Sequence, residues 1–277
     1  MLIGNYFKKI NKRYKDHYFS GLSFNSSTCR KDDIFFAIKG NKSDGNKFIF
    51  KAIKNGARTI ISKNKFEGIK KNLLYIKTKN VRKILAETSF KIFKSKPKNL
   101  IAVTGTNGKS SIAEFYFQIL TLNKKKVASI GTMGVKTKFG NSPVSNTTLD
   151  PLKLSYYLSK IKKQKINNAI LEASSHGLKQ NRLDGLKFDT AIFTNLSHDH
   201  LDYHKNFKDY LNSKLYLFKK LLKKGSNIIT DMGILEYKKI KNIAVKQKSN
   251  LNIISKNEQG LSIVSHRYSG ESQIIKT

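Results

Sequence analysis

Residues 100–111 read LIAVTGTNGKSS, and this stretch decides the fold. It passes from an apolar run, Leu100 to Thr104, through a glycine-rich loop into a segment whose apolar residues recur with the spacing of one helix face. These apolar residues are Ile112, Phe115, Tyr116, Ile119 and Leu120. The order of strand, glycine loop and helix is typical of a loop that binds phosphate groups.

The loop has the residue types that hold a nucleoside triphosphate. Glycines let the backbone approach the phosphates, Lys109 can reach the β- and γ-phosphates, and the hydroxyl of Ser110 can ligate Mg²⁺. The strict pattern G-x-x-x-x-G-K-[ST] fails at its first glycine, because Val103 stands there, so a chance turn that contains Gly-Lys is the alternative. The residues predicted to bind ATP are Gly105, Thr106, Asn107, Gly108, Lys109, Ser110 and Ser111.

On both sides of this loop, short apolar runs alternate with helical segments, which predicts an α/β fold. The expected strands lie at 34–38, 59–62, 73–76, 100–104, 127–130, 168–171, 190–194 and 227–230. The expected helices lie at 48–56, 81–93, 112–120, 152–163 and 207–222. The stretch from Lys238 onward contains three short strand-like runs, LNIIS, LSIVS and QIIKT, after which we expect no helix.

The polar segment 94–99, KSKPKN, contains Pro97 and precedes the decisive strand. We therefore place a boundary there and expect domains at 1–96 and 97–277. In the second domain, strands that alternate with helices predict a mostly parallel sheet, whose ligands bind at the carboxyl ends of its strands.

The net charge of +36 would ordinarily indicate a nucleic-acid or membrane partner. Only six of the 54 basic residues are arginine, however, and the lysines are spread along the chain with many Asn and Ile residues. Arginine binds phosphates and base edges through two parallel hydrogen bonds, which lysine cannot form, so a nucleic-acid-binding protein would be expected to contain more arginine. We therefore expect no nucleic-acid partner. No apolar run reaches the roughly 18 residues of a membrane span, and the N-terminus does not resemble a signal peptide, so a cytoplasmic protein without a membrane span is expected.

Residues 171–182, LEASSHGLKQNR, follow a predicted strand and form the next candidate segment. Glu172 at the end of this strand can hold a metal ion that bridges ATP phosphates. Ser174, Gln180 and Arg182 add groups that suit an anionic, sugar-like ligand. His176 is equally well explained as a turn residue.

Residues 194–204, TNLSHDHLDYH, place three histidines and two aspartates within seven positions, again directly after a predicted strand. A zinc hydrolase would require a fixed ligand set such as H-E-x-x-H, which is absent, so a magnesium and phosphate site that uses one histidine fits better. Lys214 lies on the following predicted helix and would, by itself, be read as a surface lysine.

Together these segments resemble the Mur ligases, and among them the type that forms UDP-N-acetylmuramoyl-tripeptide. The resemblance covers essentially the whole chain and rests on motifs in register. They are NSSTCRKDDIFFAIKGNKSDGNKFIFKAIKNGARTII (25–61), VTGTNGKSS (103–111), SIGTMG (129–134), NTTLDP (146–151), EASSHGL (172–178) and FTNLSHDHLDYH (193–204).

The resemblance assigns roles to individual residues. It implies ATP and Mg²⁺ contacts for Lys109 and Ser110, metal binding for Glu172 and His200, and a carbamylated lysine, also a metal ligand, at Lys214. Lys109, Glu172, His200 and Lys214 are the implied catalytic residues. Positions that hold the muramoyl-dipeptide substrate are Thr147, Thr148, Ser174, Gln180 and Arg182, and those near its uridine end are Ser26, Asn41, Lys42 and Ser43.

The implied protein is an ATP-dependent ligase of peptidoglycan precursor synthesis that adds a diamino acid to UDP-N-acetylmuramoyl-L-alanyl-D-glutamate. The implied fold is a small N-terminal α/β uridine-binding domain followed by a P-loop, mostly parallel-sheet ATPase domain that is incomplete at its C-terminal end. We expect the family's C-terminal ligase domain to be missing from this sequence, and therefore expect that the chain does not ligate by itself. The sequence leaves open whether the added residue is lysine or meso-diaminopimelate.

The sequence departs from the family pattern at three places. Asn25-Ser26-Ser27 stands where the uridine domain usually has DSR, Leu149 stands where a proline is frequent, and His198 stands where arginine is common. Two alternatives remain at this point: another ligase of the superfamily, such as folylpolyglutamate synthase, or a non-catalytic nucleotide-binding remnant of such a ligase.

Overall fold

The computed structural model of the chain describes residues 1–7, 10–40, 43–63, 66–200, 202–254, 265–269 and 272–276. The chain forms two compact units. The first unit contains Met1–Lys96, Asp150–Lys163 and Gln180–Leu186, and the second contains Pro97–Leu149, Gln164–Lys179 and Lys187–Thr277. Two segments of the later sequence therefore belong to the first unit, and the domain assignment 1–96 and 97–277 stays a prediction.

The first unit is built on a five-stranded sheet in the order β1 (Leu22–Ser23), β2 (Ile34–Phe36), β3 (Thr59–Ser62), β5 (Leu73–Lys77) and β4 (Gly68–Lys70). All neighbours are parallel except β4, which runs antiparallel to β5. Adjacent residues of β2 face opposite sides of the sheet: Phe36 packs with Ile61 in one apolar cluster, and Phe35 packs with Ile60 in another. Both faces of the sheet are thus covered, as a parallel sheet requires.

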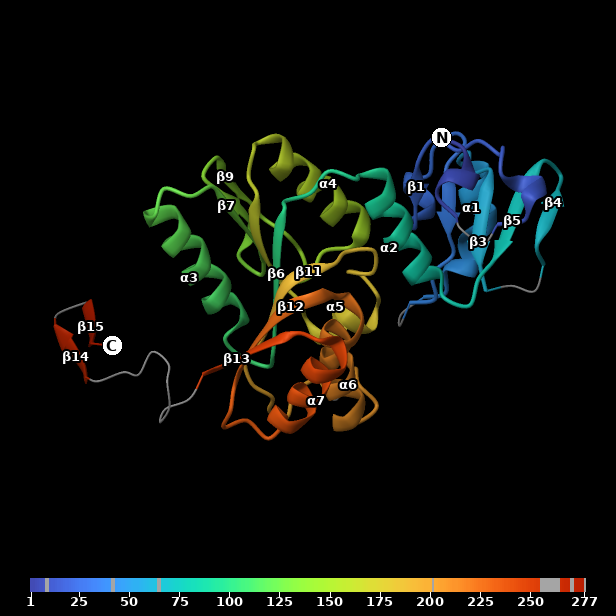
Figure 1. The fold of residues 1–277 in the computed structure, drawn as a ribbon. Helices are drawn as coiled ribbons and strands as arrows, with labels where there is room; N and C mark the ends of the chain where they lie inside the picture. Colours follow the sequence, from blue (N-terminus) through green and yellow to red (C-terminus); the bar gives the residue numbers. More distant parts are fainter. Residues whose placement is uncertain are drawn as a thin grey trace. The chain divides into compact units, whose positions relative to one another are not determined.

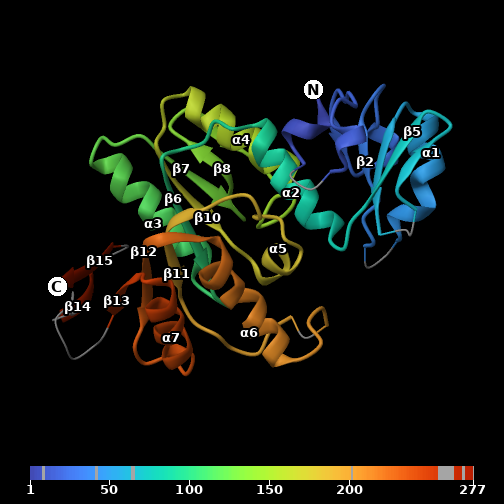
Figure 2. The ribbon, with the colours of Figure 1, turned by 45° about the vertical axis from the view of Figure 1, so that its right-hand side comes forward.

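Three α-helices belong to the first unit, namely α1 (Ile49–Lys54), α2 (Val81–Ile92) and α4 (Pro151–Lys163). Helix α2 begins at a cap in which the Asn80 side chain accepts from the backbone N–H of Lys83. Helices α2 and α4 lie side by side (Figure 2). The rings of Phe93 and Tyr156 meet edge to face at 6.4 Å between centroids. Short 3₁₀ helices are η1 (Ile3–Asn5), η2 (Lys12–Tyr14), η3 (Ser26–Thr28) and η4 (Gly45–Phe48).

The second unit is built on an eight-stranded sheet with β6 (Asn99–Thr104) in its interior (Figure 1). The order is β13 (Asn250–Ile254), β12 (Leu222–Asp231), β11 (Phe188–Phe193), β6, β10 (Asn168–Glu172), β7 (Val127–Gly131), β8 (Gly134–Thr137) and β9 (Gly140–Ser142). The strands from β13 to β7 are parallel, and only β8 and β9 are antiparallel. The prediction of a mostly parallel sheet in an α/β fold is confirmed.

The helices of the second unit are α3 (Lys109–Leu122), α5 (Ser175–Lys179), α6 (Phe207–Tyr216), the π-helical turn η5 (Leu217–Leu221) and α7 (Tyr237–Gln247). A hairpin of β14 (Ser265–Ser269) and β15 (Ser272–Lys276) follows. Helix α7, which lies before the three strand-like runs, was not predicted from the sequence. LNIIS forms most of β13 and QIIKT most of β15, whereas LSIVS lies outside the described residues apart from Ser265.

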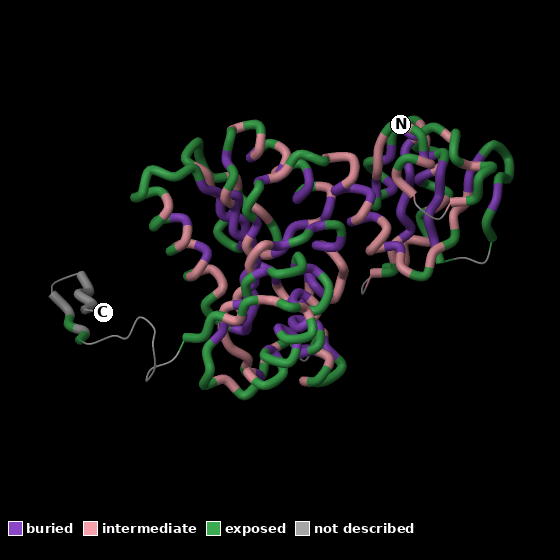
Figure 3. Tube along the Cα trace, in the orientation of Figure 1, coloured by how far each residue is buried: buried purple, intermediate pink, exposed green. Residues whose placement is uncertain are grey.

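Helix α3 forms as predicted but buries only part of the predicted face, and buried, intermediate and exposed residues alternate along it (Figure 3). Ile112 and Tyr116 pack against a cluster that contains Ala113, whereas Phe115 and Ile119 are 59% and 57% exposed. The reason is that apolar residues occupy most of the helix circumference, so their spacing does not select one face. No helix of the described residues is both long and apolar enough to cross a membrane.

Candidate functional site

The glycine loop connects the end of β6 to the start of α3, as the sequence predicts. Gly105 has φ 151°, and a Cβ atom at this position would lie 1.8 Å from Oγ1 of Thr194. Gly108, with φ 81°, is the residue before the first turn of α3. Both positions therefore favour glycine. At Gly105 the reasons are the lack of space and the positive φ, and at Gly108 the reason is the positive φ alone.

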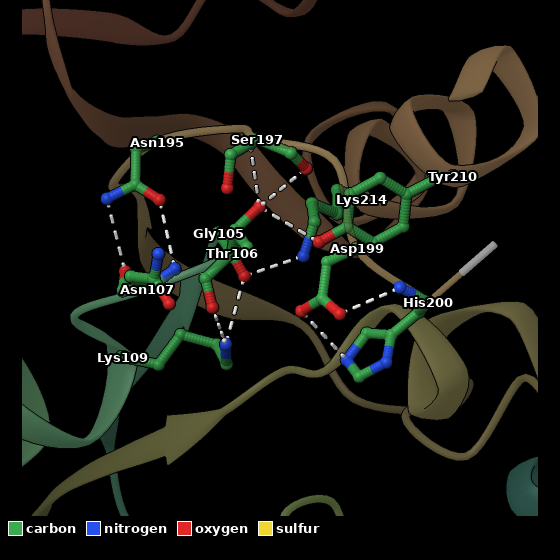
Figure 4. Close-up of polar contacts among 10 residues, drawn as sticks. All are labelled: Gly105, Thr106, Asn107, Lys109, Asn195, Ser197, Asp199, His200, Tyr210 and Lys214. Atoms are coloured by element: carbon green, nitrogen blue, oxygen red, sulfur yellow. Dashed lines mark hydrogen bonds and ion pairs between the residues drawn. The ribbon is translucent and has the colours of Figure 1, made fainter.

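The loop is fixed to the segment that follows the neighbouring strand β11 (Figure 4). Oγ1 of Thr194 donates to the carbonyl of Asn107 at 2.6 Å, and Oδ1 of Asn195 accepts from the N–H of Asn107 at 2.9 Å. The N–H of Thr106 donates to the carbonyl of Asn195 at 3.0 Å. The loop conformation thus depends on two successive strands of the parallel sheet, whose carboxyl ends lie at the same edge.

Lys109 and Lys214 both donate to the carbonyl oxygen of Gly105, at 3.0 and 2.6 Å (Figure 4). Lys109 also donates to the carbonyl of Thr106 at 2.6 Å. Lys214 comes from α6, 109 residues away from Gly105 in sequence. The structure therefore brings the predicted loop lysine and the predicted helix lysine to a single backbone oxygen.

Lys214 is not a surface lysine: it is only 1% exposed. Its pKa is lowered to about 7, mainly by burial and in addition by the charge of Lys109, while the charge of Asp199 opposes both. Burial also lowers the pKa of Lys109, whereas the carboxylates of Glu172 and Asp199 raise it. Lys214 is thus a buried amine that can lose its proton near neutral pH.

Tyr210, one turn before Lys214 on α6, supports both the loop and the buried lysine. Its hydroxyl lies 2.9 Å from Oγ1 of Thr106, which also accepts from the N–H of Ser197 at 3.0 Å. The Nζ atom of Lys214 lies 4.5 Å from the centroid of the Tyr210 ring. Sequence reasoning missed Tyr210, although its position four residues before a candidate lysine on one helix was an available signal.

Glu172 ends β10 and is buried, with both carboxylate oxygens engaged. Its Oε2 accepts from the hydroxyl of Ser110 at 2.9 Å, and its Oε1 accepts from the N–H of Thr132 at 2.8 Å. A Cβ atom on Gly131 would lie 2.1 Å from this carboxylate, so the glycine provides its space. Gly131 and Thr132, within the quoted SIGTMG motif, are site residues that the sequence did not single out.

His200 has φ 54° and lies beside Asp199. Its Nε2 is 3.4 Å from the carboxylate of Asp199, which also accepts from the backbone N–H of His200 at 2.8 Å. The imidazole ring meets that of His176 at 4.8 Å between centroids, so His176 belongs to this cluster rather than only to a turn. Within the described residues no hydrogen bond or ion pair joins His200 to Glu172 or Ser110. Asp199 was not assigned a role, yet its charge acts on both Lys109 and Lys214.

The side-chain oxygen atoms of Ser110 and Glu172 beside the loop are suitable ligands for a magnesium ion. Ser110 and Glu172 already face each other, and hydroxyl and carboxylate oxygens are ligands that Mg²⁺ accepts. In the part of the chain that the structure describes, no three His, Cys, Asp or Glu side chains are grouped so that they could hold a metal ion.

Three of the predicted substrate residues lie next to Glu172 in the second unit. Oγ1 of Thr148 donates to the backbone carbonyl of Glu172 at 2.9 Å and lies 3.0 Å from Oγ of Ser174. Oγ1 of Thr147 lies 3.0 Å from Oγ1 of Thr132, which also contacts the Glu172 carboxylate. Thr147, Thr148 and Ser174 thus surround the predicted metal ligand.

Four other predicted substrate residues line a pocket of about 480 Å³ in the first unit. They are Ser26, Ser43, Gln180 and Arg182. The side chain of Asn25 accepts from the N–H of Ser27 and begins η3, a task for which asparagine serves as well as the aspartate of the family pattern. Asn41 and Lys42, also predicted to bind substrate, lie outside the described residues. Further lining residues that the sequence did not reveal are Phe24, Phe48, Lys51, Arg82 and Asp150.

A parallel sheet, a glycine loop between a central strand and a helix, and a buried carboxylate at the neighbouring strand end define an α/β protein of the phosphate-loop class. Residues 103–276 match the Mur ligase middle domain, and residues 18–90 match the Mur ligase family, catalytic domain. The chain belongs to the Mur ligase family, and the resemblance stated from the motifs is confirmed.

Individual proteins within this family resemble the chain in sequence and in fold. The UDP-N-acetylmuramoyl-L-alanyl-D-glutamate–2,6-diaminopimelate ligase of Rickettsia prowazekii (strain Madrid E) is 41% identical over an alignment of 258 residues, and the match covers 88% of this chain and 53% of that protein. A solved structure of a ligase with the same name has a TM-score of 0.81 at 28% identity and covers 96% of this chain and 55% of its own. The MurF ligase of Thermotoga maritima in complex with ADP has a TM-score of 0.58 at 21% identity, covers 92% of this chain and 54% of its own, and shares the fold. The chain spans about half the length of the curated relatives it matches.

Proposed function

We propose that this chain carries the ATP site and the nucleotide-sugar site of an amide ligase that adds 2,6-diaminopimelate to UDP-N-acetylmuramoyl-L-alanyl-D-glutamate. The similar proteins are named for this reaction, which favours diaminopimelate over lysine as the added residue. One observation carries the proposal: Lys109 and Lys214 meet at the carbonyl of Gly105, on the same loop whose Ser110 is bonded to Glu172. Residues from three parts of the chain are thereby gathered where ATP phosphates would bind.

In the proposed reaction the D-glutamyl side-chain carboxylate attacks the γ-phosphorus of ATP and ADP leaves. An amine of the diamino acid then attacks the resulting acyl phosphate, so that the amide forms and phosphate and a proton are released. No protein nucleophile is required, and the chain's residues contribute positioning and charge neutralisation. Lys109 and the loop N–H groups would bind the phosphates. Mg²⁺, when bound, supplies positive charge to the phosphate oxygens, and Ser110, Glu172 and His200 are the residues that would hold it.

A carbamate on Lys214 belongs to the same proposal. Only a neutral amine reacts with CO₂, and the buried position of Lys214 lowers its pKa to about 7. The carbamate is an anion, so it would replace the repulsion between two neighbouring lysines with attraction and could share in metal binding. The hydrogen bond from Lys214 to the Gly105 carbonyl supports a role for this carbamate at the phosphate end of the site.

The ATP site is tested by calorimetric titration of the chain with ATP in the presence and absence of Mg²⁺. We expect Mg²⁺-dependent binding that is lost in Lys109→Met and strongly weakened in Glu172→Gln. Lys126→Met, which changes an exposed lysine of the same unit, is the matched control and should bind as the wild type does. Binding that is absent, or equally strong in all four proteins, would overturn the assignment of the loop.

The nature of the second substrate is tested by thermal unfolding with candidate ligands. UDP-N-acetylmuramoyl-L-alanyl-D-glutamate should raise the midpoint more than the precursor without D-glutamate, and a folate should leave it unchanged. A folate-dependent rise without a response to the UDP compound would instead favour a folylpolyglutamate-type ligase. We place the reaction in the cytoplasm, where ATP is available.

A further inference from the structure

Two of the chain's six arginines meet in the pocket of the first unit. Oε1 of Gln180 accepts from Nη1 of Arg82 at 3.2 Å and from Nε and Nη2 of Arg182 at 3.1 and 2.9 Å. Arg82 lies on α2, 98 residues before Gln180, so local sequence does not dictate the meeting. One amide oxygen thus holds two guanidinium groups side by side, although like charges repel.

Arg82 is held from a second side as well. Its Nη2 donates to the carbonyl of Lys39 at 3.2 Å, just before η4. Next to it, the side-chain amide of Asn80 donates to Oδ1 of Asn181 at 3.0 Å, which ties the start of α2 to the segment that carries Gln180 and Arg182. Arg82 therefore has a fixed place on the pocket wall, whereas an arginine on an exposed helix face would keep its rotamer freedom.

Among the described residues that line the pocket, cationic side chains outnumber carboxylates. Its lining includes the cations Lys51, Arg82 and Arg182 but a single carboxylate, Asp150. The Asp150 carboxylate accepts from the N–H of Lys153 and so also serves the start of α4. Three cations and one carboxylate leave two positive charges. A diphosphate diester carries two negative charges, one on each phosphate group, and would balance them. Paired guanidinium groups are the side chains best suited to bind phosphate oxygens in a defined geometry.

We propose that Arg82 is a further substrate-binding residue that, together with Arg182, binds the diphosphate of the UDP-sugar. The inference rests on the proposed function, and it adds a residue outside the motifs to the site. The same pocket offers Phe24 and Phe48, which are 40% and 41% exposed and present apolar surface on which a uracil base can stack. Its volume of about 480 Å³ lies within the range of ligand pockets.

A purely structural role for Arg82 makes a different prediction. If Arg82 only held Gln180 in place, its loss would distort the whole pocket, and every ligand would bind less well. If Arg82 binds the diphosphate, its loss affects ligands that contain the diphosphate and spares those that lack it. Uridine, UMP and UDP therefore separate the two roles.

The experiment is calorimetric titration of uridine, UMP and UDP into the wild type, Arg82→Gln and Arg82→Lys. Arg58→Gln, which alters an exposed arginine of the same unit outside the pocket, is the matched control. We expect the wild type to bind UDP more tightly than uridine. Arg82→Gln should weaken UDP binding about tenfold or more and change uridine binding by less than about twofold, because one charge-assisted contact is lost. Arg82→Lys should lie between them, and Arg58→Gln should match the wild type.

Two results would overturn the inference while the proposed function stands: unchanged UDP affinity in Arg82→Gln, or equal loss for uridine and UDP. A wild-type protein that binds neither UDP nor uridine would overturn the proposed substrate class together with the inference. The ATP titration distinguishes these cases, because it reports on the loop of the second unit and does not involve Arg82.

Discussion

The glycine loop of the second unit and the arginine pocket of the first unit are both proposed anion sites, and they are built in different ways. In the loop, the backbone defines the site: Gly105 accepts from two lysines and has no room for a Cβ atom, and Lys214 is fully enclosed. In the pocket, side chains define the site, and Arg82 and Arg182 are only partly buried around the amide of Gln180. Ligand binding at the loop should therefore be sensitive to substitutions that change shape, and ligand binding at the pocket to substitutions that change charge.

The largest expected effect follows from Gly105→Ala. The new methyl group meets Oγ1 of Thr194 at 1.8 Å in a backbone conformation that alanine disfavours, so the loop must rearrange. We expect loss of Mg²⁺-ATP binding and about 3 kcal/mol or more of lost stability in urea unfolding. UDP binding in the first unit should be unchanged.

Gly140→Ala is the matched control for this substitution. Gly140 also has a positive φ, 129°, but a Cβ atom there meets nothing within 4 Å. It should cost only the conformational strain, about 1 kcal/mol, and leave ATP binding intact. Equal effects of the two substitutions would mean that the contact with Thr194 does not define the loop.

The carbamate on Lys214 should depend on pH in a direction set by its lowered pKa. The amine is protonated and unreactive below about pH 7 and becomes neutral above it, so carbamylation in bicarbonate should increase between about pH 6 and pH 8. Carbon NMR with isotope-labelled bicarbonate would detect one protected carbamate that is absent in Lys214→Met. Carbamylation that falls as pH rises, or that persists in this variant, would contradict the assignment.

Thr106→Val should produce an intermediate effect on the loop site. The substitution keeps the shape of the side chain but removes the hydroxyl that contacts Tyr210 and accepts from Ser197. We expect a loss of about 1 to 3 kcal/mol, since buried polar groups are left without partners. Thr121→Val, at an exposed position where the hydroxyl bonds only within α3, should change the unfolding free energy by less than about 0.5 kcal/mol. A similar cost for both variants would show that the buried contact adds nothing.

The smallest expected effect lies outside both anion sites, at the ion pair of Lys136 and Glu114, whose atoms are 2.6 Å apart. Both side chains remain partly exposed, so Lys136→Met should cost about 0 to 1 kcal/mol. Lys136 lowers the pKa of Glu114, and the pair therefore stabilises the fold above the ordinary glutamate pKa and loses this effect as pH falls through the lowered value. A cost independent of pH in thermal unfolding between about pH 3 and pH 7 would contradict this account.

The sequence predicted what is local and missed what is distant. The strand, loop and helix around Lys109 could be predicted because the apolar run, the glycines and the helical spacing occupy one short stretch. The buried state of Lys214 could not, because its acceptor lies 109 residues away and only the resemblance indicated its role. The place of Arg82 in the pocket could not be predicted for the same reason, because its partner Gln180 lies 98 residues away. The buried face of α3 was only partly predicted, because apolar residues surround the helix.

The carbonyl of Gly105 makes the two lysines thermodynamically linked. Each ammonium group raises the cost of the other's charge, so a change that neutralises or reverses the charge of Lys214 must strengthen proton binding at Lys109. The linkage is reciprocal. If the charge of the Lys214 amine changes the affinity for an anion bound to Lys109, then binding of that anion changes the proton affinity of Lys214 by the same factor. On the proposed function, CO₂, protons and phosphate would therefore be three linked ligands of this loop.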